Sequence, residues 1–548
     1  GTLDKSTIDA GNSTGSLEVK ILNGANINVE SYSYGVSKII GGKNNDTVTM
    51  EGGTIAKGDI KLGKGDDIVK ITGGEIKDNS AIEGGEGKDT ITIGENAKMI
   101  GGKLNTGAGL DDKILVKDGG KLQDTEIILG GQNGGQSMDR ALFEVTGSSE
   151  LKNLQINAAE SSGEQRINFY NDAVAEVKSL TGSNQKDIID IKGKVKFNSE
   201  IQTRDGDDEL ILRNGAVLEN GLKADMGGGD DTVKITGTTI QTDASKNNQT
   251  IINTGDGVDT VIIENSKILS QDQLHMNQIN TGDGVDTVDI KGDSVLKFAE
   301  INTGDGVDKV NIGGEFFASY ANTEKGDDII NVNGQINGWS MIDAGEGRDE
   351  ITINSGAKIH QGTAIYGKEG DDTITLKSGI EFIADRNGSL LHGGEGNDTF
   401  VIEKVADINK NHRDQAGNIS SDVQINGDSG TDTLKIMDDS ASLDFSKTNI
   451  LGIERIEMGD ASKNVTLSAK NILDITKGEA SASHILDILG DGNDKVDLKG
   501  SGFTQLGNYT DDDGKVWRQY SATNTDNTLN GISHTVTIRV EDGITVDI

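Results

Sequence analysis

Short segments in which aliphatic residues alternate with polar residues recur along almost the whole chain. In residues 278–302, Val288 and Ile290 stand on either side of an aspartate, Gly292 follows them, and a second apolar cluster comes directly after. Alternation with a period of two is typical of a strand with one buried face, and glycine between two such segments is typical of a corner. The same order returns in residues 341–366. The pattern predicts two or three short strands per repeat, and helical spacing is almost absent.

A glycine turn followed by an aspartate marks each repeat. The phrase Asn-Thr-Gly-Asp-Gly-Val-Asp occurs letter for letter three times, and looser copies fill most of the remaining chain. Successive copies lie 20 to 34 residues apart when degenerate copies at Gln165 and Asn464 are included. A period of this length is typical of a solenoid. The three exact copies end at Asp259, Asp286 and Asp308, and the looser copies end at Asp46, Asp67, Asp89, Asp112, Asp139, Asp187, Asp208, Asp231, Asp328, Asp349, Asp372, Asp398, Asp432 and Asp494.

This repeat predicts an all-β fold, a parallel β-helix or β-solenoid of about 19 rungs with one Gly-Asp corner in each rung. We expect residues 1–436 to form the repeat array, with degenerate rungs at about 135–190. The pattern changes near residue 437, so residues 437–548 are expected to form a β-rich C-terminal module that caps the solenoid. The best candidate for a helix is a stretch near residues 469–476, and we expect Trp339 to lie in the core.

Composition and charge narrow the classes of function. Proline and cysteine are both absent. In a stacked solenoid nearly every strand N–H donates a hydrogen bond to the next turn, and proline has no N–H to donate. Biased base composition explains part of the absence of proline. Without cysteine, disulfides and thiolate zinc sites are excluded. The formal net charge of −38 argues against a nucleic-acid partner, because phosphate binding needs positive charge. No apolar run reaches the ~18 residues of a membrane helix, so we expect a chain that does not span a membrane.

The repeated aspartates point to a hard cation. Stacked rungs place them above one another with neighbours only ~5 Å apart, where uncompensated carboxylates repel. Multiple Ca²⁺ ions would resolve this, because calcium accepts about six to eight oxygen ligands and glycine turns expose main-chain carbonyls; magnesium fits less well. The alternative is ordinary turn chemistry, in which each aspartate caps its own backbone. The candidate metal ligands are Asp67, Asp89, Asp112, Asp208, Asp231, Asp259, Asp286, Asp308, Asp328, Asp349, Asp372, Asp398, Asp432 and Asp494.

The turn resembles the calcium-binding nonapeptide of the RTX (repeats-in-toxin) proteins. Residues 84–91 (Gly-Gly-Glu-Gly-Lys-Asp-Thr-Ile) and 393–400 (Gly-Gly-Glu-Gly-Asn-Asp-Thr-Phe) carry the resemblance. In that family the nonapeptides follow one another directly, whereas here each rung carries one copy. The resemblance therefore implies a single calcium column along one edge. We expect calcium to be missing or weak near Asp139, Gln165, Asp187 and Asn464, where turn glycines or the acid are lost.

The C-terminal segment resembles the terminal module of large bacterial surface proteins exported by type I systems. Matching phrases include residues 452–458 (Gly-Ile-Glu-Arg-Ile-Glu-Met), 490–496 (Gly-Asp-Gly-Asn-Asp-Lys-Val) and 535–540 (Thr-Val-Thr-Ile-Arg-Val). This likeness implies an uncleaved C-terminal export signal and an extracellular location, at the cell surface of a Gram-negative bacterium. Folding triggered by calcium outside the cell would suit such a route. A simple capping domain is the alternative.

No catalytic constellation emerges, so we expect a protein that is not an enzyme. Residues 11–15 fit G-x-S-x-G without the strand–turn–helix context of a nucleophile elbow, and no H-E-x-x-H exists. The favoured function is a secreted calcium-binding structural protein, as S-layer, fibre or matrix component, that assembles with itself into a lattice or filament. Cell-surface polysaccharide is a further expected partner. The alternatives are a calcium-dependent adhesin for host or surface glycans and, third, a β-helix enzyme acting on polysaccharide.

Overall fold

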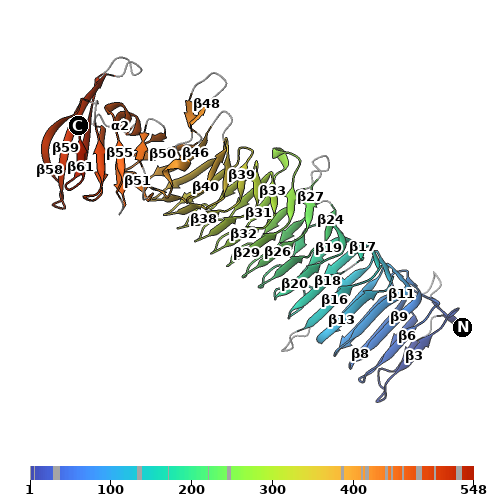
Figure 1. The fold of residues 1–548 in the computed structure, drawn as a ribbon. Helices are drawn as coiled ribbons and strands as arrows, with labels where there is room; N and C mark the ends of the chain where they lie inside the picture. Colours follow the sequence, from blue (N-terminus) through green and yellow to red (C-terminus); the bar gives the residue numbers. More distant parts are fainter. Residues whose placement is uncertain are drawn as a thin grey trace. The chain divides into compact units, whose positions relative to one another are not determined.

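The computed structural model is almost entirely β-structure, with 59% of residues in strands and 3% in helices. Two compact units are distinguished, residues 1–283 and 284–548. Within each unit successive strands stack in parallel, and the described residues form about 17 turns of a parallel β-solenoid (Figure 1). The description covers residues 2–4, 7–28, 37–131, 139–170, 172–219, 221–242, 249–383, 388–408, 411–413, 419–421, 423–438, 442–445, 448–459, 462–476, 484–498, 502–525 and 533–548.

One turn of the second unit shows how the sequence pattern becomes structure. It contains three strands, β41 (Glu350–Ile353), β42 (Lys358–His360) and β43 (Ala364–Glu369). Each pairs in parallel with its counterpart one turn later: β44 (Thr373–Leu376), β45 (Glu381–Ile383) and β46 (Ser389–Glu395). Every second side chain points inward, so Ile351, Ile359 and Ile365 are fully buried. The parallel β-solenoid prediction is confirmed, with about 17 turns against the predicted 19.

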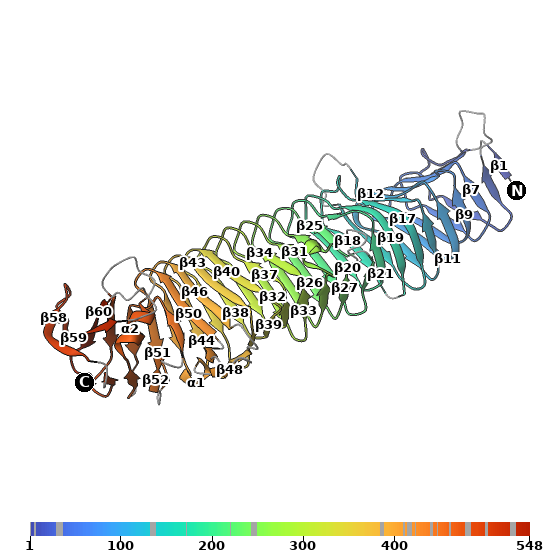
Figure 2. The same cartoon turned by 90° about the horizontal axis from the view of Figure 1, so that it is seen from above.

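The first unit is built in the same way, and Figure 2 shows its strands side by side. The strand that follows each corner forms one continuous parallel ladder, which carries the candidate site. In order these strands are β6 (Thr47–Met50), β9 (Ile68–Lys77), β11 (Thr90–Ile100), β13 (Leu110–Lys117), β16 (Arg140–Val145), β18 (Gln165–Phe169), β20 (Asp187–Ile191), β23 (Glu209–Leu212), β26 (Thr232–Thr236) and β29 (Thr260–Glu264).

The corresponding ladder of the second unit begins at β32. Its strands are β32 (Thr287–Lys291), β35 (Lys309–Ile312), β38 (Ile329–Val332), β41, β44, β47 (Thr399–Ile402), β51 (Thr433–Ile436), β54 (Arg455–Met458) and β56 (His484–Leu489).

The end of the chain departs from the simple stack. Helix α2 (Ala469–Ile475) lies where the sequence suggested one, and Ser468 and Asn471 form its capping box. Strands β58 (Thr504–Thr510), β59 (Val516–Thr525) and β60 (Ser533–Glu541) pair antiparallel with one another. A separate parallel sheet contains β52 (Ser442–Asp444), β55 (Asn464–Thr466), β57 (Lys495–Asp497) and β61 (Thr545–Asp547). The proposed division at residue 437 stays a prediction.

Two further observations concern the surface. Trp339 is 61% exposed, so the expectation that it fills the core is wrong. Its backbone adopts φ +67°, and its ring lies against Gly362, where a side chain would collide with it. Among the described residues, no helix is long and apolar enough to cross a membrane.

Candidate metal centre

In the first unit the repeated aspartates occupy one position of the ladder, directly before the strand that follows the corner. The register places Asp67 beside Asp89, and Asp187 beside Asp208. Between Asp112 and Asp187 the same position is taken by Ala141 and then by Gln165. Asp139 stands two residues before Ala141, so the expected key aspartate of that turn is displaced from the column. The column of the first unit is Asp46, Asp67, Asp89, Asp112, Ala141, Gln165, Asp187, Asp208, Asp231 and Asp259.

The second unit has its own column, which ends in a glutamate. Its members are Asp286, Asp308, Asp328, Asp349, Asp372, Asp398, Asp432 and Glu454. Asp494 lies outside it, because it precedes β57 in the separate parallel sheet. There its Oδ1 accepts from the N–H of Lys463 and its Oδ2 from that of Asp491. Thirteen of the fourteen candidate ligands therefore occupy the two columns, and Asp494 does not.

One carboxylate oxygen of each column aspartate ties consecutive turns together. The main-chain N–H of Asp349 donates to Oδ1 of Asp372 at 2.8 Å, and that of Asp372 donates to Oδ1 of Asp398 at 2.8 Å. The same bond joins Asp67 to Asp89 at 2.9 Å. At the end of the column, Asp432 donates to the Glu454 carboxylate at 3.0 Å. Each aspartate therefore acts, through Oδ1, as an acceptor for the turn before it, rather than for the backbone of its own turn.

The second carboxylate oxygen is buried and lacks a hydrogen-bond partner in many turns. This holds for Oδ2 of seven column aspartates whose turns offer no neighbouring hydroxyl: Asp67, Asp89, Asp112, Asp231, Asp349, Asp372 and Asp398. These residues are at most 1% exposed. In the Asp208 and Asp328 turns, hydroxyls of Thr203 and Thr323 lie nearby but donate to the carbonyls of Met226 and Ala344, both at 2.6 Å. A buried carboxylate oxygen without a donor is unfavourable, so a proton or a cation beside this oxygen would stabilise these turns.

Two turns of the first unit are closed by the chain's own groups. Oδ2 of Asp46 accepts from the N–H of Gly42 at 2.6 Å, and Oδ2 of Asp187 accepts from the N–H of Ser183 at 2.7 Å. Both turns lack the glycine that stands two residues before most other aspartates of the columns. Open and closed turns thus coexist in one column, and this glycine does not separate them, because the open Asp112 turn has Leu110 at the same place.

Burial raises the pKa of the open-turn carboxyl groups. Loss of solvent is the main cause, and the neighbouring aspartates of the column add to it, while the hydrogen bond from the preceding turn acts in the opposite direction. The pKa reaches about 7 for Asp89, Asp372 and Asp398, and about 8 for Asp231 and Asp349. Near neutral pH these groups would therefore hold protons unless a cation takes their place.

The open turns fit a hard cation in the chemistry of their donors. A Cβ on Gly393 would meet Oδ2 of Asp398 at 2.1 Å and the carbonyl oxygen of Gly427 at 2.7 Å. A Cβ on Gly84 would meet Oδ2 of Asp89 and the carbonyl of Thr106, both at 2.4 Å. In these two turns carboxylate and carbonyl oxygens thus converge beside a glycine, and calcium favours oxygen ligands of this kind. Among the described residues, no three Asp, Glu or His side chains are placed to hold one metal ion, so main-chain carbonyls would supply much of any ligand set.

Comparison with known proteins identifies no family. No family model matches the chain, and no curated protein matches its sequence. Among solved structures, one similar chain is a hyperactive, Ca²⁺-dependent, β-helical antifreeze protein from an Antarctic bacterium. The two share 17% identity with a TM-score of 0.29, over 66% of this chain and 83% of that one. At this distance the likeness has no bearing on function.

The sequence predicted Gln165 as a degenerate copy of the key position, and the register places it in the first column, but the sequence missed Glu454 as a member of the second. Gln165 is fully buried in place of an aspartate, and Glu454 accepts the hydrogen bond that an aspartate accepts elsewhere. The polar residue directly before the alternating strand at 455–458 is the signal that could have found Glu454.

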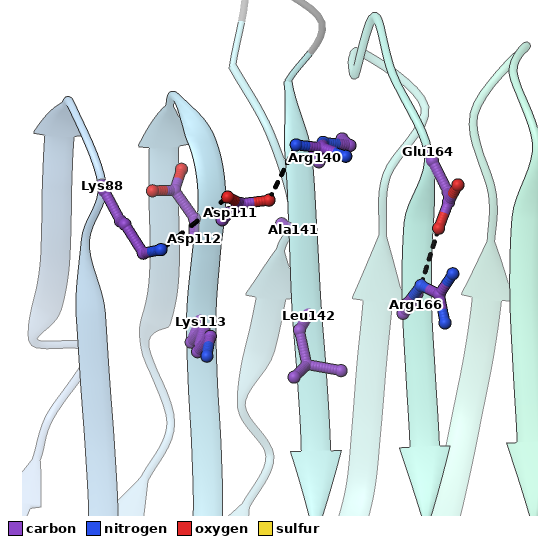
Figure 3. A pocket seen from close by; sticks show the side chains of 9 residues that line it. All are labelled: Lys88, Asp111, Asp112, Lys113, Arg140, Ala141, Leu142, Glu164 and Arg166. Atoms are coloured by element: carbon purple, nitrogen blue, oxygen red, sulfur yellow. Dashed lines mark hydrogen bonds and ion pairs between the residues drawn. The ribbon is translucent and has the colours of Figure 1, made fainter.

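An open groove lies beside the interruption in the first column (Figure 3). Arg140 and Lys88 both reach Asp111, with N–O distances of 3.0 and 3.7 Å, and Arg166 pairs with Glu164 at 2.6 Å. The chain's own cations therefore gather where the aspartate column is broken.

Stacked glycines two residues before the aspartates make the turns possible, and their replacement gives a direct prediction. Gly347 has φ +151°, and a Cβ there would lie 1.6 Å from the carbonyl oxygen of Gly326. Gly379 also has positive φ, at +90°, but a Cβ there meets nothing within 4 Å. We expect Gly379→Ala to cost about 1 kcal/mol, from backbone strain alone. Gly347→Ala, which adds a main-chain collision, should cost at least ~3 kcal/mol.

Chemical denaturation of both variants, in calcium, measures the difference. Equal losses of stability would contradict the close stacking of the glycine column.

Proposed function

We propose that this protein is a secreted, calcium-stabilised β-solenoid that serves as a structural component of a bacterial cell surface. The observation that supports it most is the two columns of buried aspartates, in which the second carboxylate oxygen has no donor in seven described turns. A carboxylate ladder of this kind is stable only with protons or cations. Calcium is the cation whose preference for carboxylate and carbonyl oxygens matches the turn.

The residues that would hold calcium are the thirteen candidate aspartates of the two columns, together with main-chain carbonyls of the glycine turns. Bound calcium would supply positive charge against the carboxylates. The chain itself would do the rest: the N–H to Oδ1 bonds would fix each aspartate, and the stacked glycines would let consecutive turns approach closely. The residues are Asp67, Asp89, Asp112, Asp208, Asp231, Asp259, Asp286, Asp308, Asp328, Asp349, Asp372, Asp398 and Asp432.

An extracellular, structural role is consistent with this chemistry. Free calcium is scarce in cytoplasm and abundant outside cells, so a chain that needs many calcium ions would complete its fold only after export. The repeat-family likeness of the turns and the export-module likeness of residues 437–548 support the Gram-negative cell surface as the destination. We further propose self-assembly into a lattice or filament, with surface polysaccharide as a partner. A glycan-binding adhesin is the second candidate, favoured by the exposed indole of Trp339.

Metal content and particle shape test this proposal together. After dialysis against calcium and removal of free ions, elemental analysis is expected to find on the order of ten calcium ions per chain, because the open turns number at least seven. Electron microscopy of the same sample should show sheets or fibres that disperse in a chelator. Fewer than two bound ions would refute calcium stabilisation. Monomers that bind glycans, with calcium bound, would favour the adhesin.

A further inference from the structure

The interruption of the first column is filled by a side-chain amide. Gln165 occupies the aspartate position and is fully buried. Its Nε2 lies 2.5 Å from the carbonyl oxygen of Asp139, 2.5 Å from Oγ of Ser161 and 2.8 Å from the carbonyl oxygen of Gly163. Three oxygens from two consecutive turns therefore surround one donor atom.

The orientation of this amide follows from its neighbours. Main-chain carbonyls can only accept hydrogen bonds, so the nitrogen of the amide, and not its oxygen, must face Asp139 and Gly163. The Ser161 hydroxyl itself donates to the Asp139 carbonyl at 2.9 Å, which leaves Oγ to accept from Gln165. The positive end of the amide thus gathers the oxygens of the turn, as a cation would in an open turn.

The next turn is also closed without an added ion. Ser183 donates from its N–H to Oδ2 of Asp187 at 2.7 Å, and its hydroxyl lies 3.3 Å from Oδ1 of the same residue. By contrast, Oδ2 of Asp89 and of Asp231, on the two sides of the interruption, has no hydrogen-bond partner among the described groups. The Asp187 turn therefore satisfies its own carboxylate, and the Gln165 turn places an amide where the open turns have a carboxylate, while Oε1 of Gln165 and Oδ1 of Asp139 are buried without a hydrogen-bond partner in the described part of the chain.

The core of these turns contains an aromatic pair. Phe143 and Phe169 are fully buried one turn apart, with ring centroids 6.0 Å apart and an interplanar angle of 80°. Edge-to-face pairs of this kind add ~0.5–1.5 kcal/mol beyond the area that they bury. On the surface of these turns, Arg140 pairs with Asp111 and Arg166 with Glu164 (Figure 3). Such exposed ion pairs contribute little to stability.

We propose that residues 139–191 form a calcium-independent clamp within the first unit. The Gln165 amide and the Ser183 donors take the place of bound ions, and the aromatic pair stabilises the same turns by packing. The clamp would stay folded when calcium is withdrawn, while the open turns before and after it loosen. The chain would thus keep a metal-free segment from which calcium-bound turns extend in both directions. This inference rests on the proposed calcium binding of the open turns.

Hydrogen exchange with mass spectrometry on the full chain, with calcium and in EGTA, tests the clamp. In EGTA we expect the amides of β9 and β26 to exchange faster by on the order of 100-fold. One calcium ion at about one hundred times its dissociation constant raises the ratio of closed to open turns by that factor, and EGTA removes this effect. Amides of β18 and β20 should change by less than about threefold. If no segment responds to calcium, the proposed function fails and the clamp fails with it. If β18 and β20 respond as strongly as β9, only the clamp is refuted.

A conservative variant separates the amide from the packing around it. Gln165→Glu replaces the donor by a carboxylate and so should convert the closed turn into one that needs a cation. We expect β18 to lose protection in EGTA and to recover it when calcium is added. The control is Gln202→Glu, the same change at an exposed position of β22 (Ile201–Gln202), which should leave β18 unchanged in both conditions. Full protection of β18 in Gln165→Glu without calcium would overturn the role of the amide.

Discussion

Withdrawal of calcium by a chelator is expected to lower the melting temperature of this protein by about 15 °C. A ligand at one hundred times its dissociation constant stabilises the folded state by about 2.7 kcal/mol per site. The seven turns with an unpartnered Oδ2 would together contribute about 19 kcal/mol. The entropy of unfolding is about 2.1 cal/mol/K per residue, or about 1.2 kcal/mol/K for 548 residues, and the ratio gives the expected shift.

Circular dichroism melts in 2 mM CaCl₂ and after addition of excess EGTA measure this shift. Magnesium at the same concentration is the matched control, and it should restore little of the loss because it prefers a small octahedral shell and retains its water. Long repeat arrays lose two-state cooperativity. In EGTA the transition should therefore also broaden, because the open turns would melt at a lower temperature than the clamp. Equal melting temperatures in calcium and EGTA would refute the calcium assignment.

The regular turns could be predicted from the sequence because glycine and aspartate meet strict steric demands there. Gly347 needs positive φ and a close approach to the turn below, and Asp349 is buried with its Oδ1 tied to a neighbour. The same steric demands recur in each regular turn, so the same residue types recur in the sequence. After each corner, apolar and polar residues alternate because one face of the following strand packs in the core and the other faces outward. Strand order, parallel pairing and the column were accessible for this reason.

Irregular turns could not be placed in this way. The bulge between Leu110 and Asp112 shifts the register of the ladder, so Ala141 and not Asp139 continues the column. Asp494 carries the full glycine–aspartate phrase, but the path of the C-terminal strands puts it in another sheet. The role of Gln165 depends on three oxygens brought together by two consecutive turns, and no local pattern reports such a meeting. The positions of these residues depend on the path of the backbone in three dimensions, which the sequence repeat does not determine.

The second large effect concerns pH, and its direction should reverse between the metal-free and the calcium-loaded protein. In the metal-free protein, Asp89 and Asp349 have folded-state pKa values of about 7 and about 8, above the ordinary value of 3.8. Between pH 4 and these values the folded state binds more protons than the unfolded state, so its stability falls as pH rises. Each such carboxyl group contributes a slope of about 1.4 kcal/mol per pH unit. In the metal-free protein, three buried aspartate carboxyl groups of this kind would together lower the melting temperature by on the order of 10 °C between pH 5 and 7.5.

With calcium bound, the same carboxylates must lose their protons to hold the ion, so binding strengthens as pH rises and stability rises with it. Melts at pH 5, 6, 7 and 8, in EGTA and in calcium, should therefore give two curves of opposite slope that diverge toward pH 8. Asp349→Asn supplies the matched control, because the amide keeps one oxygen for the N–H of Asp328 and removes one titrating group. In EGTA this variant should melt higher than the wild type at pH 8 and should lose part of the pH slope. In calcium it should melt lower, since one carboxylate ligand is gone. Parallel pH curves, or a variant that changes in the same direction in both conditions, would show that the buried aspartates bind neither protons nor calcium in this way.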